Sequence, residues 1–298
     1  MQSELDRNGT GPEGTDREGA ADTARLALFG HSHVNCLIAS LEAAPRPGVV
    51  SRALRLRPRD KQLRRQTPGI ETEGLREATL GDLCRMIARL GGYPPRIAPH
   101  KIPGIAKAEG VVTVLSIRGI QHVFRGLAET DPPYDFVLPS EPDLPLEPDT
   151  VLLPSGLIED YYRRVFAGSL DHISMIHDRV RHNLCHIEMP PPYGDNDWLV
   201  GRLGAKIEDD RGEALALSRP LLRYKLWRVA SGIYRTHCES LGVTWIPVPP
   251  DLTVADPGGG RFLHPDGWHE DGIHANTAYG ARMVDEILAA MPGPNRPN

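Results

Sequence analysis

Residues 25–30, Arg25-Leu-Ala-Leu-Phe-Gly30, form a short apolar run that ends in glycine, and residues 34–41 continue with apolar side chains at helical spacing. A short apolar run of this kind predicts a buried strand, and its final glycine permits a tight turn. The segment therefore predicts a strand–turn–helix unit. Its turn carries His31, Ser32 and His33.

The same alternation of strands and helices continues to the end of the chain. Further strands are predicted at 49–56, 111–117, 182–188 and 243–248, and helices at 79–90, 157–180, 220–241 and 277–291. Loops are predicted at 131–155, 195–215 and 249–270. This order favours a single α/β domain with a mainly parallel sheet and helices on both faces. In such sheets, ligands bind beyond the carboxyl ends of the strands.

The composition fits one domain with two unstructured ends. The chain has 298 residues, of which 40% are hydrophobic, enough to bury a sizeable core. Residues 1–24 lack apolar content and are predicted to be a disordered tail. Residues 25–291 are predicted to form the domain, and 292–298 a flexible C-terminal tail.

The charge and the cysteine content limit the kinds of partner and the cellular compartment that we expect. Lys and Arg number 34 against 39 Asp and Glu, a net charge of −5, so no general attraction to nucleic acid or anionic membrane is expected. The arginines within 52–65 form either a solvated charged face or a local anion site. With no signal peptide, no membrane-spanning run and no CxxC pair, we expect a cytoplasmic protein with reduced, buried thiols.

Ser32 follows the first predicted strand and precedes a helix N-terminus. Free N–H groups at such a terminus can stabilise an oxyanion, so Ser32 is a candidate nucleophile. A serine that only caps the helix is the alternative. The C-terminal segment favours the nucleophile, because Asp271 and His274 stand three residues apart in a glycine-containing turn. A serine hydroxyl needs a nearby base, and the base needs a partner on its other ring nitrogen.

Gly30-x-Ser32 near the start and Asp271-Gly-Ile-His274 near the end resemble the first and last sequence blocks of the SGNH/GDSL hydrolase superfamily. The last block continues to Gly280 in the form Asp-Gly-x-His-x-Asn-x-x-x-Gly. In the first block, Gly-His-Ser-His replaces the usual Gly-Asp-Ser. The resemblance spans 25–291. It implies a flavodoxin-like three-layer α/β/α sandwich and a catalytic set of Ser32, Asp271 and His274.

The resemblance also implies an oxyanion hole that uses the Ser32 N–H and residues after the third strand. That strand is followed by Arg118-Gly-Ile-Gln-His122, where Gly119 matches the expected glycine and the usual Asn is absent. Gln121 offers the same amide on a longer side chain, and in another register Ile120 takes this place. A further glycine, expected after the second strand, corresponds to Gly69, Gly91 or Gly92.

Other polar residues at the predicted strand ends are candidates for substrate binding. His31, His33 and His122 are predicted to line the pocket, with helix capping as an equal alternative for His122. Glu188 and the proline run 190–192 follow another strand and are predicted to form a rigid wall.

The sequence thus predicts a carboxylic-ester hydrolase without metal or cofactor, acting on a small-molecule or carbohydrate ester through an acyl-enzyme on Ser32. An O-acyltransferase would use the same site with an alcohol as acceptor. A metal-dependent hydrolase would instead use the histidine-rich cluster as N and O ligands. The members of that cluster are His31, His33, His264, His269, Asp271 and His274. A non-catalytic binding protein with the same fold is the third alternative.

Overall fold

The computed structural model describes residues 23–55, 77–92, 110–117, 126–180, 183–203 and 216–291. Its centre is a five-stranded sheet in which every pairing is parallel and the strand order is β2-β1-β3-β6-β7. The strands are β1 (Ala24–Gly30), β2 (Val49–Arg55), β3 (Val111–Ser116), β6 (Leu184–Ile187) and β7 (Thr244–Ile246). Among these five strands, the order is the 2-1-3-4-5 arrangement of flavodoxin-like sheets.

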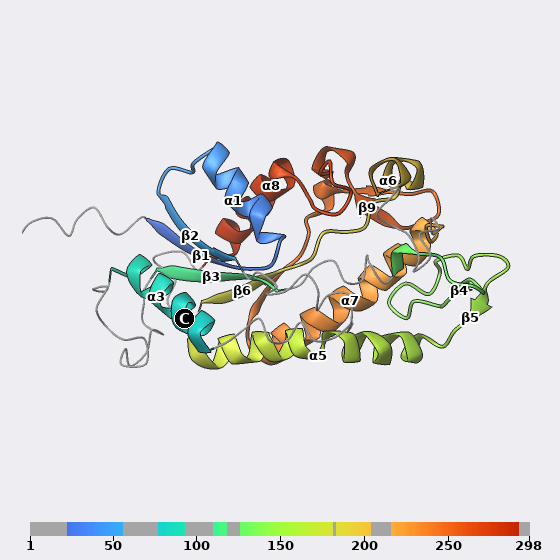
Figure 1. Cartoon of the computed structure of the whole chain (residues 1–298), viewed down its shortest axis with the longest axis horizontal. Helices are drawn as coiled ribbons and strands as arrows, with labels where there is room; N and C mark the ends of the chain where they lie inside the picture. The colour runs from blue at the N-terminus through green and yellow to red at the C-terminus, as the bar shows by residue number, and fades with distance from the viewer. Residues whose placement is uncertain are drawn as a thin grey trace, which may run out of the picture.

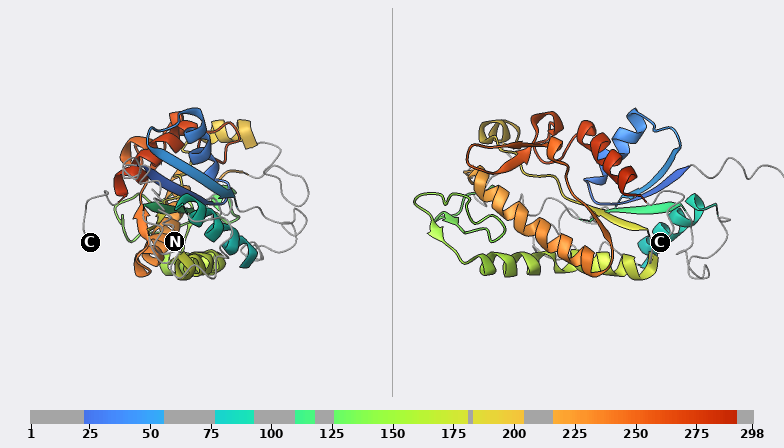
Figure 2. Two further views of the ribbon diagram at one scale, coloured as in Figure 1. Left: turned by 90° about the vertical axis from the view of Figure 1, so that its left-hand side faces the viewer. Right: turned by 180° about the vertical axis from the view of Figure 1, so that it is seen from behind.

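Helices cover both faces of the sheet (Figures 1 and 2). One face carries α1 (Val34–Ala43) and α8 (Thr277–Ala290), which pack on each other. The other carries α3 (Glu77–Leu90), α5 (Ser155–Val180) and α7 (Pro220–Ser240), with α5 against α7. The predicted α/β sandwich with a parallel sheet and helices on both sides is confirmed.

The central strands are apolar throughout because their alternate residues pack on opposite faces of the sheet, and both faces are buried. Leu26 and Leu28 of β1 pack in the cluster formed with α1 and α8. Ala27 and Phe29 belong to the cluster formed with α3, α5 and α7. Since successive side chains of a strand point to opposite faces, a strand buried on both sides needs a continuous apolar run.

Gly30 closes β1 where the chain approaches the neighbouring strand most closely. A Cβ at this position would lie 2.2 Å from the carbonyl oxygen of Ser116, the last residue of β3. The N–H of His31 donates to that same carbonyl at 2.9 Å. The chain runs from β1 to β2 on one side and then to β3 on the other, so the turn after Gly30 lies at the point where the strand order reverses. Ligands of flavodoxin-like folds bind at this point.

Three segments predicted as loops contain regular structure. Helix α6 (Asn196–Leu203) lies within 195–215, whose residues 204–215 are outside the described part. An antiparallel pair, β8 (Thr253–Ala255) and β9 (Arg261–Leu263), lies within 249–270. A short parallel pair, β4 (Tyr134–Asp135) and β5 (Val151–Leu152), lies within 131–155.

A buried ion pair fastens segment 131–155 to helix α7. Lys225 Nζ lies 2.9 Å from both carboxylate oxygens of Asp135, and both side chains are fully buried. Asp135 also accepts hydrogen bonds from the backbone N–H groups of Phe136 and Glu147. The buried charges are therefore paired and hydrogen-bonded, which is what a low-dielectric site requires.

Two findings bear on the sequence expectations about cysteines and membranes. All four cysteines are buried thiols outside any disulfide, as predicted. Of the helices in the described ranges, none combines the length and apolar character needed to cross a bilayer.

Candidate functional site

Ser32 lies in the turn between β1 and α1, at the carboxyl edge of the sheet. The residue at the N-cap position of α1 is His33, which makes no side-chain capping hydrogen bond. The Ser32 carbonyl accepts from the Asn35 N–H at 3.0 Å. Within the described residues, neither the Ser32 hydroxyl nor its N–H makes a hydrogen bond. The interpretation of Ser32 as a helix cap is therefore not supported, and no described residue occupies either group.

Asp271 and His274 form a direct hydrogen bond. His274 Nδ1 lies 2.6 Å from Asp271 Oδ2, and Asp271 Oδ1 accepts from the backbone N–H groups of Ile273 and His274, each at 2.9 Å. Gly272 between them has φ of 73°, a left-handed conformation that a glycine adopts without strain. This turn lets one short segment deliver both side chains.

The hydrogen bonds around Asp271 keep its carboxylate ionised. Burial alone raises the pKa of this carboxyl, but the hydrogen bonds from the His274 ring and from two backbone N–H groups outweigh burial and hold the pKa well below its usual value. A carboxylate on Nδ1 favours the tautomer with the proton on that nitrogen. His274 Nε2 is then a lone-pair acceptor, the form that a general base requires.

His274 Nε2 is buried and has no hydrogen-bond partner in the described residues. Since unpartnered buried polar atoms are rare, this nitrogen marks a place where a further group is expected. The ring of His33 packs against that of His274, with centroids 5.3 Å apart. The turn after β1 and the Asp271–His274 turn, more than 230 residues apart, therefore meet at one place.

A network of hydrogen bonds holds the turn that carries Asp271 and His274. Asn276 caps α8 by accepting from the Tyr279 N–H at 3.1 Å, while its amide donates to the carbonyls of Asp266 and Trp268 at 2.7 and 3.0 Å. The His269 N–H donates to the His274 carbonyl at 3.2 Å, which closes the turn at its base. The turn that carries His274 is thus fixed to the start of α8.

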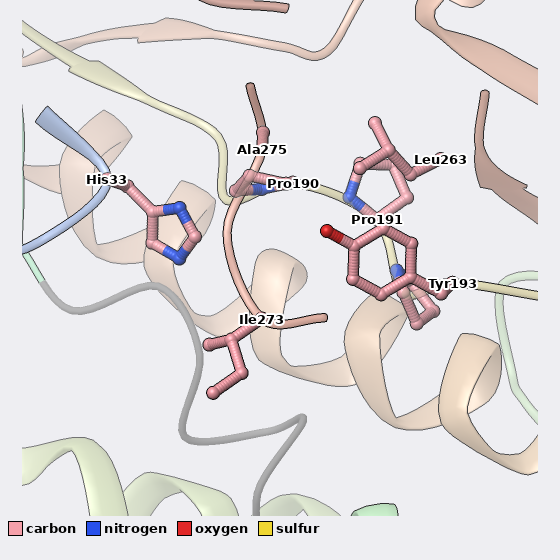
Figure 3. A pocket seen from close by; sticks show the side chains of 8 residues that line it. His33, Pro190, Pro191, Tyr193, Leu263, Ile273 and Ala275 are labelled. Atoms are coloured by element: carbon pink, nitrogen blue, oxygen red, sulfur yellow. The ribbon is translucent and has the colours of Figure 1, made fainter. Parts of the chain in front are cut away.

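A small pocket lies beside this turn (Figure 3). His33 lies on one side, and the prolines 190–192 with Tyr193 form another wall, as the proline run was predicted to do. Ile273 and Ala275, the neighbours of His274, complete it together with Leu263. Apart from His33, the side chains that line it are apolar or aromatic.

The carboxylate of Glu188 is held by hydrogen bonds within the fold. Its carboxylate accepts hydrogen bonds from Ser231 Oγ on α7 and from the Val248 N–H, the latter at 2.8 Å. Burial raises the pKa of this carboxyl. Glu188 therefore joins β6, α7 and the segment after β7, whereas the prolines that follow it reach the pocket.

The described part of the chain contains only some of the predicted site residues. Gly119, Gln121 and His122 lie outside it, and so does Gly69. Gly91 and Gly92 form the turn that ends α3, so neither directly follows a strand. His31 is half-buried next to Ser32, and its N–H is bonded to the Ser116 carbonyl.

In the histidine-rich cluster, His264 contacts Asp266, whereas His269 and His274 both contact Asp271. His264 Nδ1 lies 3.5 Å from Asp266, His269 Nδ1 lies 3.2 Å from Asp271 Oδ1, and His274 is bonded to the other oxygen of Asp271. Within the described ranges, no group of three or more His, Cys, Asp or Glu side chains is arranged to hold a metal ion.

Tyr193 is the residue near this turn that the sequence reasoning missed. Its hydroxyl donates to the His274 carbonyl at 2.5 Å and accepts from the His269 N–H at 3.3 Å. It stands 81 residues before His274, and no motif surrounds it apart from the preceding prolines. The prolines were the one available signal, because they predicted a rigid segment at a strand end.

Comparison with known proteins gives little similarity. No protein-family model matches the chain, and no curated protein matches its sequence. Among solved structures, the chain is similar to a GDSL-like lipase from Bacteroides thetaiotaomicron, with a TM-score of 0.37 and 9% sequence identity. The alignment covers 89% of this chain and 85% of that chain. We therefore base the function on the geometry of the site.

Proposed function

We propose that the protein is a serine-dependent hydrolase of carboxylic esters, of SGNH/GDSL type, with Ser32 as nucleophile, His274 as base and Asp271 as its orienting acid. The observation that carries the proposal is the Asp271–His274 pair, joined at 2.6 Å, whose Nε2 is left without a partner among the described residues. A base in this tautomer with a buried Nε2, packed against the turn that carries the Ser32 hydroxyl, supports nucleophilic catalysis.

Acylation begins when Ser32 Oγ attacks the ester carbonyl carbon. His274 Nε2 takes the Ser32 proton as the Oγ–C bond forms, and Asp271 stabilises the resulting imidazolium. The negative charge moves to the carbonyl oxygen, where the free Ser32 N–H is one donor and Gly119 and Gln121 supply others. The intermediate then collapses, the bond to the alcohol oxygen breaks, and Nε2 returns its proton to that oxygen.

Deacylation repeats these steps with water. Nε2 takes a proton from a water molecule as its oxygen bonds to the acyl carbon, and the same donors hold the oxyanion. The bond to Ser32 Oγ then breaks, and Oγ regains a proton from His274. The products are a carboxylic acid, an alcohol and the free enzyme. The Ser32 hydroxyl is not bonded to His274 here, as is common in ligand-free enzymes, whose catalytic hydrogen bonds tighten with substrate.

A fluorophosphonate probe tests this assignment. The probe bonds covalently to an activated serine oxygen with loss of fluoride, and the labelled peptide is mapped by mass spectrometry. We expect a single label on Ser32, which disappears in Ser32→Ala and falls at least 100-fold in rate in His274→Ala. Ser51→Ala and His177→Ala are matched controls, since both residues lie outside the site, on β2 and α5.

Other results would contradict the proposal. A folded protein without label on Ser32 would point to a binding protein. Ester hydrolysis that needs an added divalent metal and is abolished by chelation would favour the metal-dependent alternative. Unfolding curves of each variant, compared with wild type, separate a loss of chemistry from a loss of folded protein.

A further inference from the structure

Tyr193 connects the turn that carries Asp271 and His274 to a different part of the fold. Its hydroxyl binds both ends of this turn at once, donating to the His274 carbonyl and accepting from the His269 N–H. Figure 3 shows the hydroxyl directed toward the segment that joins Ile273 and Ala275. The hydroxyl therefore lies where the two ends of the turn meet.

Tyr193 is itself held in place at its ring and at its backbone. Its ring packs edge-on against Trp268, with centroids 5.3 Å apart, and against Trp198 of α6 at 5.1 Å. Its carbonyl accepts from Arg223 Nη2 of α7 at 3.0 Å. Only 4% of Tyr193 is exposed. A hydroxyl fixed in this way can restrict the backbone that it binds, because moving it would disturb packing on two elements.

The guanidinium that holds the Tyr193 carbonyl is buried as well. Arg223 also donates to the Ser218 carbonyl and to Asn196 Oδ1, the latter at 2.7 Å. Burial lowers the pKa of Arg223 to about 10, so it stays charged at neutral pH. Burial also raises the pKa of the Tyr193 hydroxyl well above its usual value, so this hydroxyl remains a donor over the whole working range.

We infer that Tyr193 is a positioning residue for the catalytic base, fixing the backbone of His274 so that the Asp271–His274 hydrogen bond keeps its geometry. This inference rests on the proposed function. Supporting groups of this kind matter because catalytic geometry must hold within about 0.5 Å. Without the hydroxyl, the His274 carbonyl would keep, among the described residues, the 3.2 Å bond from His269. The turn would lose its hydrogen-bonded link to Tyr193, whose carbonyl Arg223 of α7 holds.

Tyr193→Phe removes the hydroxyl and leaves the ring packing in place. Tyr224→Phe is the matched control, because Tyr224 is equally buried and its hydroxyl donates to Glu141 Oε2 at 2.7 Å, outside the Asp271–His274 turn. Tyr193→Phe loses two hydrogen bonds between neutral groups, and Tyr224→Phe loses one to a carboxylate, which is about twice as strong as a neutral one, so both should show a similar decrease in melting temperature. A purely structural role for Tyr193 predicts that the two variants behave alike in every assay.

The first readout is the rate at which fluorophosphonate labels Ser32 in the full chain. We expect Tyr193→Phe to label about 3- to 10-fold more slowly than wild type, and Tyr224→Phe to stay within about twofold. The second readout is the downfield proton resonance of His274 Nδ1–H, which reports the bond to Asp271 directly. We expect it to weaken or broaden in Tyr193→Phe and to persist in Tyr224→Phe.

The outcomes separate this inference from the proposed function. If wild type is labelled on Ser32 but Tyr193→Phe matches it in rate and in the Nδ1–H resonance, the role of Tyr193 is overturned and the hydrolase assignment stands. Equal losses in Tyr193→Phe and Tyr224→Phe also overturn it, because they would reflect stability alone. If wild type is not labelled at all, the hydrolase assignment fails and takes the positioning role with it.

Discussion

Asp271 and His274 are three residues apart, so their hydrogen bond is a local feature that a short sequence pattern can encode. Gly272 supplies the left-handed conformation, and the N–H groups that follow satisfy the second carboxylate oxygen. The role of His274 in the site depends on long-range contacts. The chain must bring it against the turn after β1, where the His33 ring meets it.

Asp271→Asn tests the orienting role of the carboxylate. An Asn oxygen can still accept from the two backbone N–H groups, so the turn should keep its shape. An amide N–H directed at Nδ1, however, favours the tautomer with the proton on Nε2, which cannot accept the serine proton. We expect ester hydrolysis and probe labelling to fall about 1000- to 10,000-fold. Steady-state and labelling rates of the purified variant measure the effect.

Asp266→Asn is the control for this substitution, because Asp266 lies in the same segment and its side chain is exposed. It should keep the wild-type rate within about twofold, as surface substitutions usually have small effects. A rate for Asp271→Asn within tenfold of wild type, with an intact Ser32 label, would remove Asp271 from the mechanism.

The residues of the site were predictable from the sequence only as far as their contacts are local. Asp271 and His274 were identified together, and Ser32 was placed after the first strand. Tyr193 was missed because its contact with His274 spans 81 residues and uses a backbone carbonyl, which no side-chain pattern reveals. The contact of the His33 ring with His274 was likewise invisible in the sequence, although His33 was predicted near the site.

At the scale of elements, helices α1 and α8 approach each other closely enough to require a glycine. A Cβ at Gly280 of α8 would lie 2.0 Å from the carbonyl oxygen of Cys36 on α1. Backbone atoms form this contact, so no side-chain movement can relieve it. Because α1 follows Ser32 and α8 follows His274, the packing of these two helices sets how Ser32 and His274 are placed relative to each other.

Gly280→Ala should therefore destabilise the protein, whereas the same substitution at Gly232 of α7 should not. We expect a loss of about 1–3 kcal/mol in the free energy of unfolding, since helices that cannot separate without disturbing the core must absorb the overlap. Gly232→Ala in α7 is the control, because a Cβ there meets nothing within 4 Å. It should gain about 0.5–1 kcal/mol from helix propensity. Urea unfolding of both variants measures the difference, and a neutral Gly280→Ala would contradict the close contact.

The sequence predicted the elements of the sheet and their covering helices to within a few residues. Strands β1 and β3 are short apolar runs, β2 alternates apolar and polar residues, and each long helix has an apolar face. Helix α6 was missed because its only buried side chains are Leu199 and Leu203, too few for a clear helical period. The β8–β9 pair was missed because its strands are three residues long and separated by glycines.

At the scale of the whole molecule, the sequence indicated a parallel sheet but gave the strand order only through a family resemblance. Alternating strands and helices are compatible with several orders. Long-range packing selects one strand order, and His186 takes part in such packing. It lies on β6, stacks on Trp245 of β7 with centroids 5.5 Å apart, and accepts from the Ile117 N–H after β3 at 3.2 Å. One buried ring thus bonds or packs across three neighbouring strands.

His186 should make the stability of the molecule depend on pH. Burial lowers the pKa of His186 from 6.5 to about 4, and the nearby His237 acts in the same direction. Above pH 6.5 the ring is neutral in both the folded and the unfolded chain. Between pH 6.5 and 4 the unfolded chain binds a proton that the folded chain does not, so stability falls as the pH falls. The loss from this residue is on the order of 3 kcal/mol.

Glu188 contributes with the opposite sign, because burial raises the pKa of its carboxyl and the folded chain then binds a proton at higher pH than the unfolded chain. Comparison of variants separates the contribution of His186 from that of Glu188. His186→Gln places an amide oxygen where it can accept from the Ile117 N–H, and this side chain does not titrate. We expect its free energy of unfolding, measured in urea from pH 7 to 4, to fall less steeply than that of wild type. His177→Gln is the control on α5, where the side chain is partly exposed, and it should follow the wild-type curve. Parallel curves for wild type and His186→Gln would mean that His186 is protonated in the folded chain and that its contact with the Ile117 N–H does not persist in solution.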